Sequence, residues 1–176
     1  MEKNNCKKGF TLVEVLVSLF IIVLLSTLIF VFNRQSNMQY NLLRSANKLV
    51  QDIRVAQQMA MTTKSYNNCS AGYKLKGYGV EFVQGNNFYH LMVRCENAGI
   101  YSDSSLSSIP LETGVEISNL TFNPSMDIFF YPPDPTVDLK NGMDDTNVVT
   151  ITIRLQSDHS KTKTIEVNKS GLINVQ

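Results

Sequence analysis

Glu14 sets the chemistry of the N-terminal segment, because it places a carboxylate inside an otherwise apolar run. Residues 10–32 read FTLVEVLVSLFIIVLLSTLIFVF and contain no Pro, Gly, Lys, Arg or Asp. As a helix this run would be about 34 Å long, enough to cross a hydrocarbon core of about 30 Å. A carboxylate in such a segment costs about 2.5–3.5 kcal/mol at the bilayer centre and less near the interface.

The cost of Glu14 has a natural offset if the chain begins at Phe10. Glu14 would then lie in the first helical turn, near the positive end of the helix dipole. It would also be within reach of a free terminal amine, either its own or that of a neighbouring copy. The position of Glu14 therefore predicts cleavage before Phe10 and lateral packing of several copies.

Other kinds of N-terminal segment fit less well. A cleavable secretory signal has an apolar stretch of about 7–15 residues and then an A-x-A-like site, neither of which occurs here. A lipoprotein signal places a cysteine after the apolar stretch, but Cys6 precedes it. A plain membrane anchor fits the length and leaves Glu14 unexplained. Lys7 and Lys8, just before the run, predict that the head stays in the cytoplasm and the body lies across the membrane.

Cys69 and Cys95 are the cysteines of the body, and they become an even pair if the head with Cys6 is removed. Outside the cytoplasm such a pair favours a disulfide. Closing a loop of this length would stabilise the fold by about 3–4 kcal/mol in the chain-entropy description. Two unrelated buried thiols are the alternative.

The two histidines, His90 and His159, do not indicate catalysis. Asp158, His159 and Ser160 form a Ser/His/Asp set of the kind that arises by chance, and no nucleophile elbow supports it. The body cysteines lack the paired spacing of a zinc site. We therefore expect that the protein is not an enzyme and has no cofactor.

Two groups of charged residues are candidates for other ligands. The first group lies in a Pro-rich loop, and its side-chain oxygens are suited to calcium. Their spacing is not that of an EF-hand, and aspartates that are simply solvated in a loop are the commoner explanation for such a group. This group consists of Asp134, Asp138, Asn141, Asp144, Asp145 and Asn147. A DNA site needs clustered cations, but the net charge is +1 and acidic neighbours dilute the basic residues. These are Arg154, Lys161, Lys163 and Lys169, for which we favour a solvated, mixed-charge sheet edge.

A single long helix must carry Glu14 and continue beyond the apolar run. No Gly or Pro occurs between Phe10 and Thr63, so one helix of about 50 residues is the simplest interpretation. Apolar residues recur at steps of four and three, which predicts a face packed on a core. They are Met38, Leu42, Ala46, Leu49, Ile53, Ala56 and Ala60, while Arg44, Lys48, Asp52 and Arg54 are expected in water.

After this helix the pattern changes to strands. A hairpin is predicted from Tyr73–Val83 and Phe88–Arg94 around the turn at 84–87. Further strands are predicted at Val115–Phe122, Asp127–Tyr131, Val148–Gln156, Lys163–Val167 and Leu172–Val175. The segments Ser102–Ser108 and Pro132–Asn147 are predicted to be loops, the second because prolines break strands.

The junction at residues 7–14, KKGFTLVE, resembles the processing site of type IV prepilins. The resemblance implies that a membrane-embedded prepilin peptidase cuts between Gly9 and Phe10 and methylates the new amine of Phe10. It implies that Glu14 pairs with the N-terminus of a neighbouring subunit during assembly. Other pilin or pseudopilin subunits, an inner-membrane assembly platform and membrane lipid are the implied partners.

The body resembles one branch of that family. The segment GYGVEF at 77–82 and the segment FFYP at 129–132 are similar to those of H-type pseudopilins of type II secretion and FimT minor pilins. Pro133–Asp134–Pro135 departs from the glycine that often follows there. The resemblance implies an α+β pilin fold, with the long helix packed on an antiparallel β domain. The implied division is a leader at 1–9, a transmembrane and assembly helix at 10–32, an amphipathic continuation at 33–63 and a β domain at 64–176.

Together these features predict a structural subunit, a minor pilin or pseudopilin, in the bacterial inner membrane with its β domain in the periplasm. The alternative is a membrane-anchored binding module, for example a minor pilin that captures DNA. Protein secretion, adhesion, motility and DNA uptake all remain open as the process served.

Overall fold

The computed structural model describes residues 10–62, 66, 69–133, 137–139 and 146–176, without the side chains of residues 28–35. The chain divides into two compact units, one ending at Asn37 and one covering Met38–Gln176. The fold is α+β, as predicted: a helix packs against antiparallel β-sheets. Helix α1 spans Leu12–Met61 and therefore contributes residues to both units.

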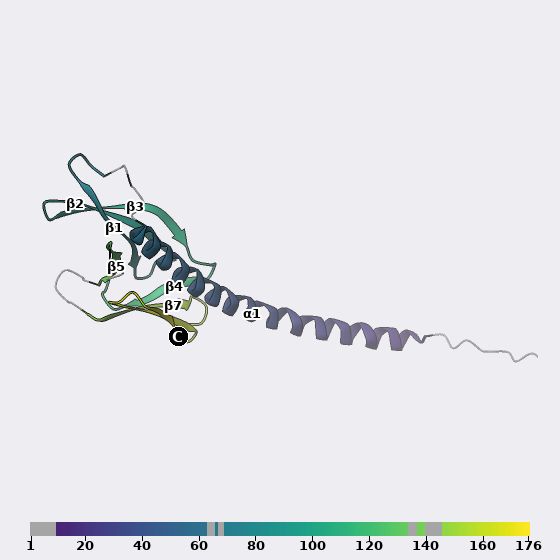
Figure 1. The fold of residues 1–176 in the computed structure, drawn as a ribbon. Coiled ribbons are helices and arrows are strands. Elements are labelled where there is room, and N and C mark those ends of the chain that lie inside the picture. Colours follow the sequence, from purple (N-terminus) through teal and green to yellow (C-terminus); the bar gives the residue numbers. More distant parts are fainter. Residues whose placement is uncertain (1–9, 63–65, 67–68, 134–136, 140–145) are drawn as a thin grey trace, which may run out of the picture. The chain divides into compact units, whose positions relative to one another are not determined.

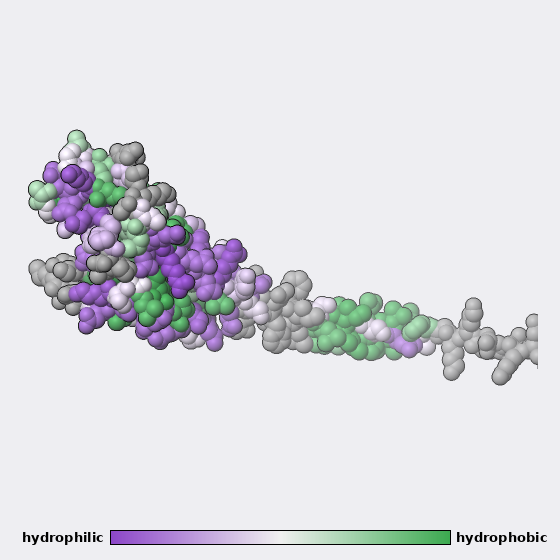
Figure 2. Space-filling model, viewed as in Figure 1, coloured by the Kyte–Doolittle hydropathy of each residue, from purple (hydrophilic) through white to green (hydrophobic). Residues whose placement is uncertain are grey.

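The first unit is the N-terminal part of α1, and its described surface is apolar. Leu12, Leu16 and Phe20 are exposed by 81%, 62% and 65%, and Figure 2 shows hydrophobic side chains gathered along this part of the helix. The hydroxyls of Ser18 and Ser26 donate to carbonyl oxygens four residues earlier, at 2.8 and 2.7 Å, so these polar side chains are satisfied within the helix.

The length and hydropathy needed to cross a bilayer are not met by any helix within the described residues. The span expected at 10–32 extends into residues 28–35, whose side chains lie outside the description.

The second unit begins with the rest of α1, whose buried face confirms most of the predicted stripe. The buried residues of that stripe are Leu42, Ala46, Leu49, Ile53, Ala56 and Ala60. Met38 was expected to join them but is 38% exposed, because it lies at the first position of this unit. Asp52 was expected in water but is half-buried, since it accepts a hydrogen bond from the hydroxyl of Tyr89.

Two sheets complete the second unit (Figure 1). The five-stranded sheet has the order β3-β2-β1-β5-β6, and the four-stranded sheet has the order β4-β7-β8-β9. The strands of the first are β1 Lys74–Val83, β2 Phe88–Asn97, β3 Ile100–Pro110, β5 Ser125–Phe130 and β6 Val137–Asp138. Those of the second are β4 Val115–Leu120, β7 Val148–Leu155, β8 Thr162–Asn168 and β9 Ile173–Val175.

The β1–β2 turn joins the two sheets. Gly85 in this turn has a φ of 84°, which favours glycine, and the hairpin predicted around it is confirmed. The Gly85 amide donates to the carbonyl oxygen of Ile117 at 2.8 Å, and the Ile117 amide donates to that of Asn86 at 2.9 Å. The turn of one sheet therefore pairs with β4, the edge strand of the other.

The prediction of a loop at Ser102–Ser108 is wrong, because β3 runs through it. Five serines gave the segment neither the alternation nor the composition of a strand. Its residues are mostly exposed, so β3 is defined by its pairing with β2 and not by a buried face. The second predicted loop, Pro132–Asn147, also contains a short strand, β6, which pairs with Phe129 and Phe130.

Candidate functional site

The first helical turn of α1 is capped by Thr11, directly before Leu12. The amide of Glu14 lies 3.3 Å from the hydroxyl oxygen and 3.1 Å from the carbonyl oxygen of Thr11. Thr11 is thus an N-cap residue whose side-chain oxygen accepts from the amide of the third helical residue, which is one of the two hydrogen bonds of a capping box. The sequence analysis missed this role of Thr11, although the T-x-x-E spacing at 11–14 is its known signal.

Glu14 therefore has a fixed place at the positive end of the helix, and its side chain is exposed. No hydrogen bond or ion pair of its carboxylate is found within the described residues. Phe10, four residues earlier, is 81% exposed. An exposed carboxylate in the first helical turn can accept a charge-assisted hydrogen bond from the amine of a neighbouring chain. Gly9 and the rest of the expected leader, 1–9, lie outside the described residues.

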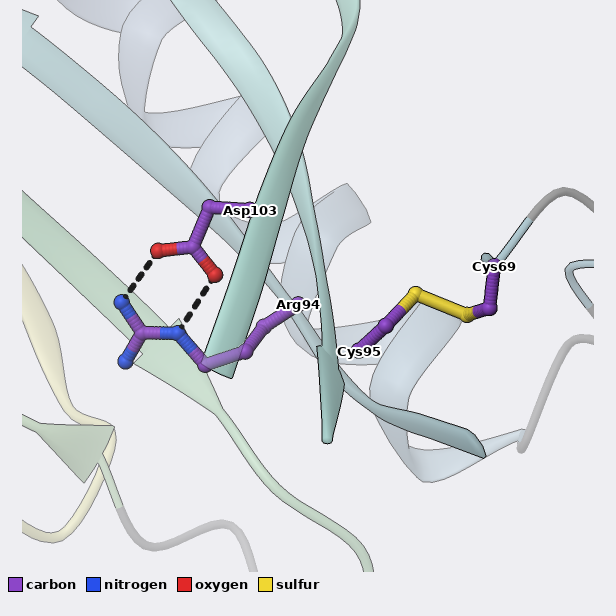
Figure 3. Close-up of a disulfide and its surroundings, with 4 residues drawn as sticks. All are labelled: Cys69, Arg94, Cys95 and Asp103. Carbon is purple, nitrogen blue, oxygen red and sulfur yellow. Dashed lines mark hydrogen bonds and ion pairs between the residues drawn. A yellow bond between two sulfur atoms is a disulfide. The ribbon is translucent and has the colours of Figure 1, made fainter. Parts of the chain in front are cut away.

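The disulfide expected between Cys69 and Cys95 is present in the structure (Figure 3), with 5.9 Å between the two Cα atoms. Cys95 is buried in β2, whereas Cys69 lies in the connection from α1 to β1. The bond therefore attaches this connection to the central hairpin of the five-stranded sheet.

Arg94 is the centre of a polar cluster that the sequence analysis did not identify. Its Nε and Nη2 atoms donate to the two carboxylate oxygens of Asp103 at 2.7 and 2.6 Å, and its Nη1 atom donates to the Tyr131 hydroxyl at 2.9 Å. Its guanidinium lies 3.7 Å from the centroid of the Phe129 ring. Burial alone would lower the pKa of Arg94, but hydrogen bonds to Asp103 and Tyr131 raise it, so the side chain stays charged.

Two glycines of β1 make room for this cluster. A Cβ atom at Gly77 would lie 2.6 Å from the Tyr131 ring, and one at Gly79 would lie 2.6 Å from the Phe129 ring. The two rings stack with an interplanar angle of 6° and a centroid separation of 6.5 Å. Aromatic side chains thus cover glycines of the neighbouring strand. The segments GYGVEF and FFYP, far apart in sequence, are two halves of one packing arrangement.

Acidic residues face each other beside this cluster. Glu81 of β1 lies directly opposite Asp127 of β5. Burial raises the pKa of Asp127, and the neighbouring charge of Glu81 raises it further. On the other side of β1, His90 of β2 lies directly opposite Glu81.

The structure does not bring the two histidines together. His90 is in β2 of the five-stranded sheet, with its Nδ1 atom 3.3 Å from the Ser105 hydroxyl. His159 is exposed in the turn between β7 and β8 of the other sheet. Beside it, Asp158 accepts hydrogen bonds from the hydroxyl and the amide of Ser160 at 2.6 and 3.1 Å, which lowers the pKa of its carboxyl.

The structure describes only part of the candidate calcium loop. Asp134, Asn141, Asp144 and Asp145 lie outside the described residues. Asp138 belongs to β6 and accepts a hydrogen bond from Tyr131 at 3.3 Å. Among the described residues, no group of three or more acidic, histidine or cysteine side chains has the arrangement of a metal site.

The basic residues considered for DNA lie on and around β7 and β8. Arg154 is paired with Glu116 of β4, its Nε atom 2.6 Å from the carboxylate. Lys161 is exposed and Lys163 is half-buried. The charge of Arg154 is thus compensated within the sheet, so less positive charge is available to bind the phosphate backbone of DNA.

Comparisons with known proteins identify the N-terminal segment. The prokaryotic N-terminal methylation motif matches residues 4–30, which include Phe10, Thr11 and Glu14. No curated protein and no solved structure matches the chain significantly. The chain therefore carries the leader motif of type IV pilins and pseudopilins, which implies a structural prepilin that is anchored in the inner membrane, processed by prepilin peptidase and assembled with other pilins.

Proposed function

We propose that this protein is a minor pilin or pseudopilin, a structural subunit of a type IV pilus or of a type II secretion pseudopilus. The observation that carries the proposal is the exposed carboxylate of Glu14 in the first turn of an exposed apolar helix, within the matched methylation motif. An apolar helix that carries one carboxylate at its positive end is suited to side-by-side packing in which an amine meets that carboxylate.

Processing would occur between Gly9 and Phe10, with methylation of the new Phe10 amine. The assignments 1–9 as leader, 10–32 as transmembrane helix, 33–63 as its amphipathic continuation and 64–176 as β domain belong to this proposal. Thr11 supports it, because this cap lies on the mature side of the cut and holds the start of α1 without the leader.

Within this class we favour the branch of the H-type pseudopilins and FimT minor pilins. The support is the interdependence of Gly77, Gly79, Phe129 and Tyr131. These residues lie in the two segments on which the resemblance of the body rests. Their contacts give a physical reason for the two segments to occur together.

The decisive experiment is to determine the mature N-terminus by mass spectrometry and to follow assembly. We expect a chain that starts at a methylated Phe10. The Gly9→Ala variant should remain uncut, whereas Glu14→Ala should be cut but fail to assemble. Ser18→Ala, one turn further along the same helix, is the matched control and should behave as wild type. Normal processing of Gly9→Ala and normal assembly of Glu14→Ala would contradict the roles given to these residues.

The alternative is a membrane-anchored binding module that does not polymerise, such as a DNA receptor. It predicts an intact Met1 and function without assembly. The pairing of Arg154 with Glu116 does not favour the DNA version. Retardation of DNA by the protein at low salt, lost in Lys161→Ala and Lys163→Ala variants, would favour it.

A further inference from the structure

The second unit has two ends along α1, and contacts of the helix locate them. At the first, here called the entry end, the chain enters the unit at Met38, and Lys48 donates to the carbonyl oxygen of Pro110 at 3.2 Å. At the second, here called the far end, α1 finishes, and Gln57 donates to the carbonyl oxygen of Gly171 at 3.5 Å. Because Pro110 is the last residue of β3, this long strand starts at the far end and finishes beside α1 at the entry end (Figure 1).

Exposed large apolar side chains gather at these two ends. At the entry end they are Met38, Tyr40 and Leu43, and at the far end they are Ile100, Tyr101, Val148 and Leu172. Val148 joins the far end through Asn168, which pairs with it and donates its amide to the carbonyl oxygen of Leu172 at 3.0 Å. Elsewhere among the described residues of this unit, Val55 and Val175 are the exposed large apolar residues. Between the ends, the outer face of the four-stranded sheet is polar, with Thr150, Thr152, Thr164 and Glu166.

The far end carries a tip, and the entry end carries a hollow. The tip is the β2–β3 turn, where Ala98 and Gly99 have φ angles of 49° and 86°, as in the tightest hairpins. Ile100 and Tyr101 follow the turn and are exposed by 64% and 51%. The hollow has a volume of about 340 Å³ and lies along one side of α1. Its lining residues are Tyr40, Leu43, Arg44, Asn47, Lys48 and Gln51.

The chemistry of the tip complements that of the hollow. The guanidinium of Arg94 lies 5.2 Å from the centroid of the Tyr101 ring, and half of this tyrosine remains exposed. Arg44 in the hollow is paired with Glu112, but its side chain is 62% exposed and can lie over the ring of another tyrosine. Tyrosine and arginine are residues that protein interfaces favour near their centres. An apolar tip with an exposed tyrosine therefore fits a hollow that combines Leu43 with an arginine.

We propose that the tip of one copy docks in the hollow of a second copy of this chain. Gln57 at the far end follows Leu43 by fourteen residues, so the two ends are about 21 Å apart along the helix. The second copy is therefore displaced along α1 by this distance or more, with its helix parallel to that of the first. A contact between two different patches repeats from copy to copy and extends a filament.

This arrangement rests on the proposed function and makes it more specific. Copies that are anchored side by side at one depth of a membrane are not displaced along the helix, so they cannot form the contact. Copies packed into a filament with staggered, parallel helices can form it. The contact should therefore appear only on assembly.

Photocross-linking in the bacterium that makes the protein tests the contact. A photoreactive benzoyl-phenylalanine replaces Ile100, and two copies of the chain carry different affinity tags so that links between copies can be isolated. We expect mass spectrometry to map the links to residues 40–51 of the second copy. They should fall several-fold in a strain that lacks the inner-membrane assembly platform. The same photoreactive group at Asn174, exposed in the middle of β9, is the matched control and should give no such link.

An exchange of charges provides a second test. Ile100→Glu and Leu43→Glu should each lower the assembled fraction several-fold, because each places a carboxylate in the contact. Both residues are exposed, so the melting temperature and the cut before Phe10 should stay as in wild type. The double variant Ile100→Glu with Leu43→Lys brings opposite charges together and should restore assembly.

Three results would overturn the contact while leaving the cut and the role of Glu14 intact. They are links from position 100 that are as strong without the assembly platform, links only to other proteins or other segments, and a double variant as defective as Ile100→Glu. A wild-type chain that keeps Met1 and does not assemble would overturn the proposed function together with this contact.

Discussion

Arg94 and Cys95 are neighbours in β2 whose side chains point to opposite faces of the sheet, and each makes a strong link (Figure 3). Arg94 binds the carboxylate of Asp103 on β3 through two hydrogen bonds. Cys95 is bonded to Cys69 in the connection that follows α1. Two consecutive residues thus link β2 to the neighbouring strand β3 on one face of the sheet and to the connection after α1 on the other face.

The Arg94→Met variant is expected to lower the free energy of unfolding by about 2 kcal/mol, because it leaves a partly buried carboxylate without its cation. Urea unfolding of the chain in detergent micelles measures the change. Arg94→Lys keeps the charge but loses the two-pronged contact, so it should fall between wild type and Arg94→Met. A loss in Arg94→Lys as large as in Arg94→Met would show that charge contributes little.

Replacement of both Cys69 and Cys95 by serine is expected to lower the free energy of unfolding by about 3–4 kcal/mol, since the unfolded chain gains the freedom of the open loop. Reduction of the wild-type protein should have the same effect and should leave the double variant unchanged. Mass analysis after alkylation without reductant checks the bond itself. Two alkylated body thiols would contradict the pairing.

The Gly79→Ala variant should destabilise the protein by about 1–3 kcal/mol, because the new Cβ would overlap the backbone oxygen of Ile128 and the Phe129 ring and force the neighbouring strand to move. Thermal unfolding measures the effect. Lys74→Ala, an exposed position in the same strand, is the control and should change stability by less than about 0.5 kcal/mol. A wild-type melting temperature for Gly79→Ala would mean that β5 and its Phe129 ring are not held closely against β1.

Asp127 should make stability fall as the pH rises. Its pKa in the folded protein is above the ordinary value of 3.8, so the folded state binds this proton more tightly than the unfolded state. The destabilisation is absent below the ordinary pKa and complete above the raised one. Asp127→Asn should therefore stabilise the protein at pH 7 by a few tenths of a kcal/mol to about 1 kcal/mol, and not at pH 3.

Unfolding curves at the two pH values test this expectation. Glu81→Gln removes the opposing charge and should also stabilise at pH 7. Asp158→Asn is the contrasting control, because hydrogen bonds lower the pKa of that carboxyl. A stabilisation by Asp127→Asn that is equal at both pH values would exclude an electrostatic origin.

The sequence predicted the long helix, its buried stripe and most strands, because these elements follow simple periods of hydrophobic residues. Val149, Ile151 and Ile153 alternate and are all buried, as expected. It failed at β3, where the hydrogen bonds to β2 create a strand from residues that bury little. A strand that depends on a partner distant in sequence leaves no local pattern.

The candidate sites also differ in how far they could be predicted from the sequence. The junction around Phe10 and Glu14 was recognisable because its spacing is local. The cluster of Arg94, Asp103 and Tyr131 was not, because its members come from three different strands or their ends and meet only in the folded sheet. The glycines at 77 and 79 were a visible signal, but their reason is the pair of rings that covers them.

The hydrogen bonds between the β1–β2 turn and Ile117 have a consequence for how the protein opens. Since the main chain of one sheet completes the edge of the other, neither sheet can separate without exposing amides of both. The amides of Gly85 and Ile117 should therefore exchange with solvent deuterium at one common rate, set by the opening of the whole β domain. We therefore expect the two sheets to unfold together as one cooperative unit.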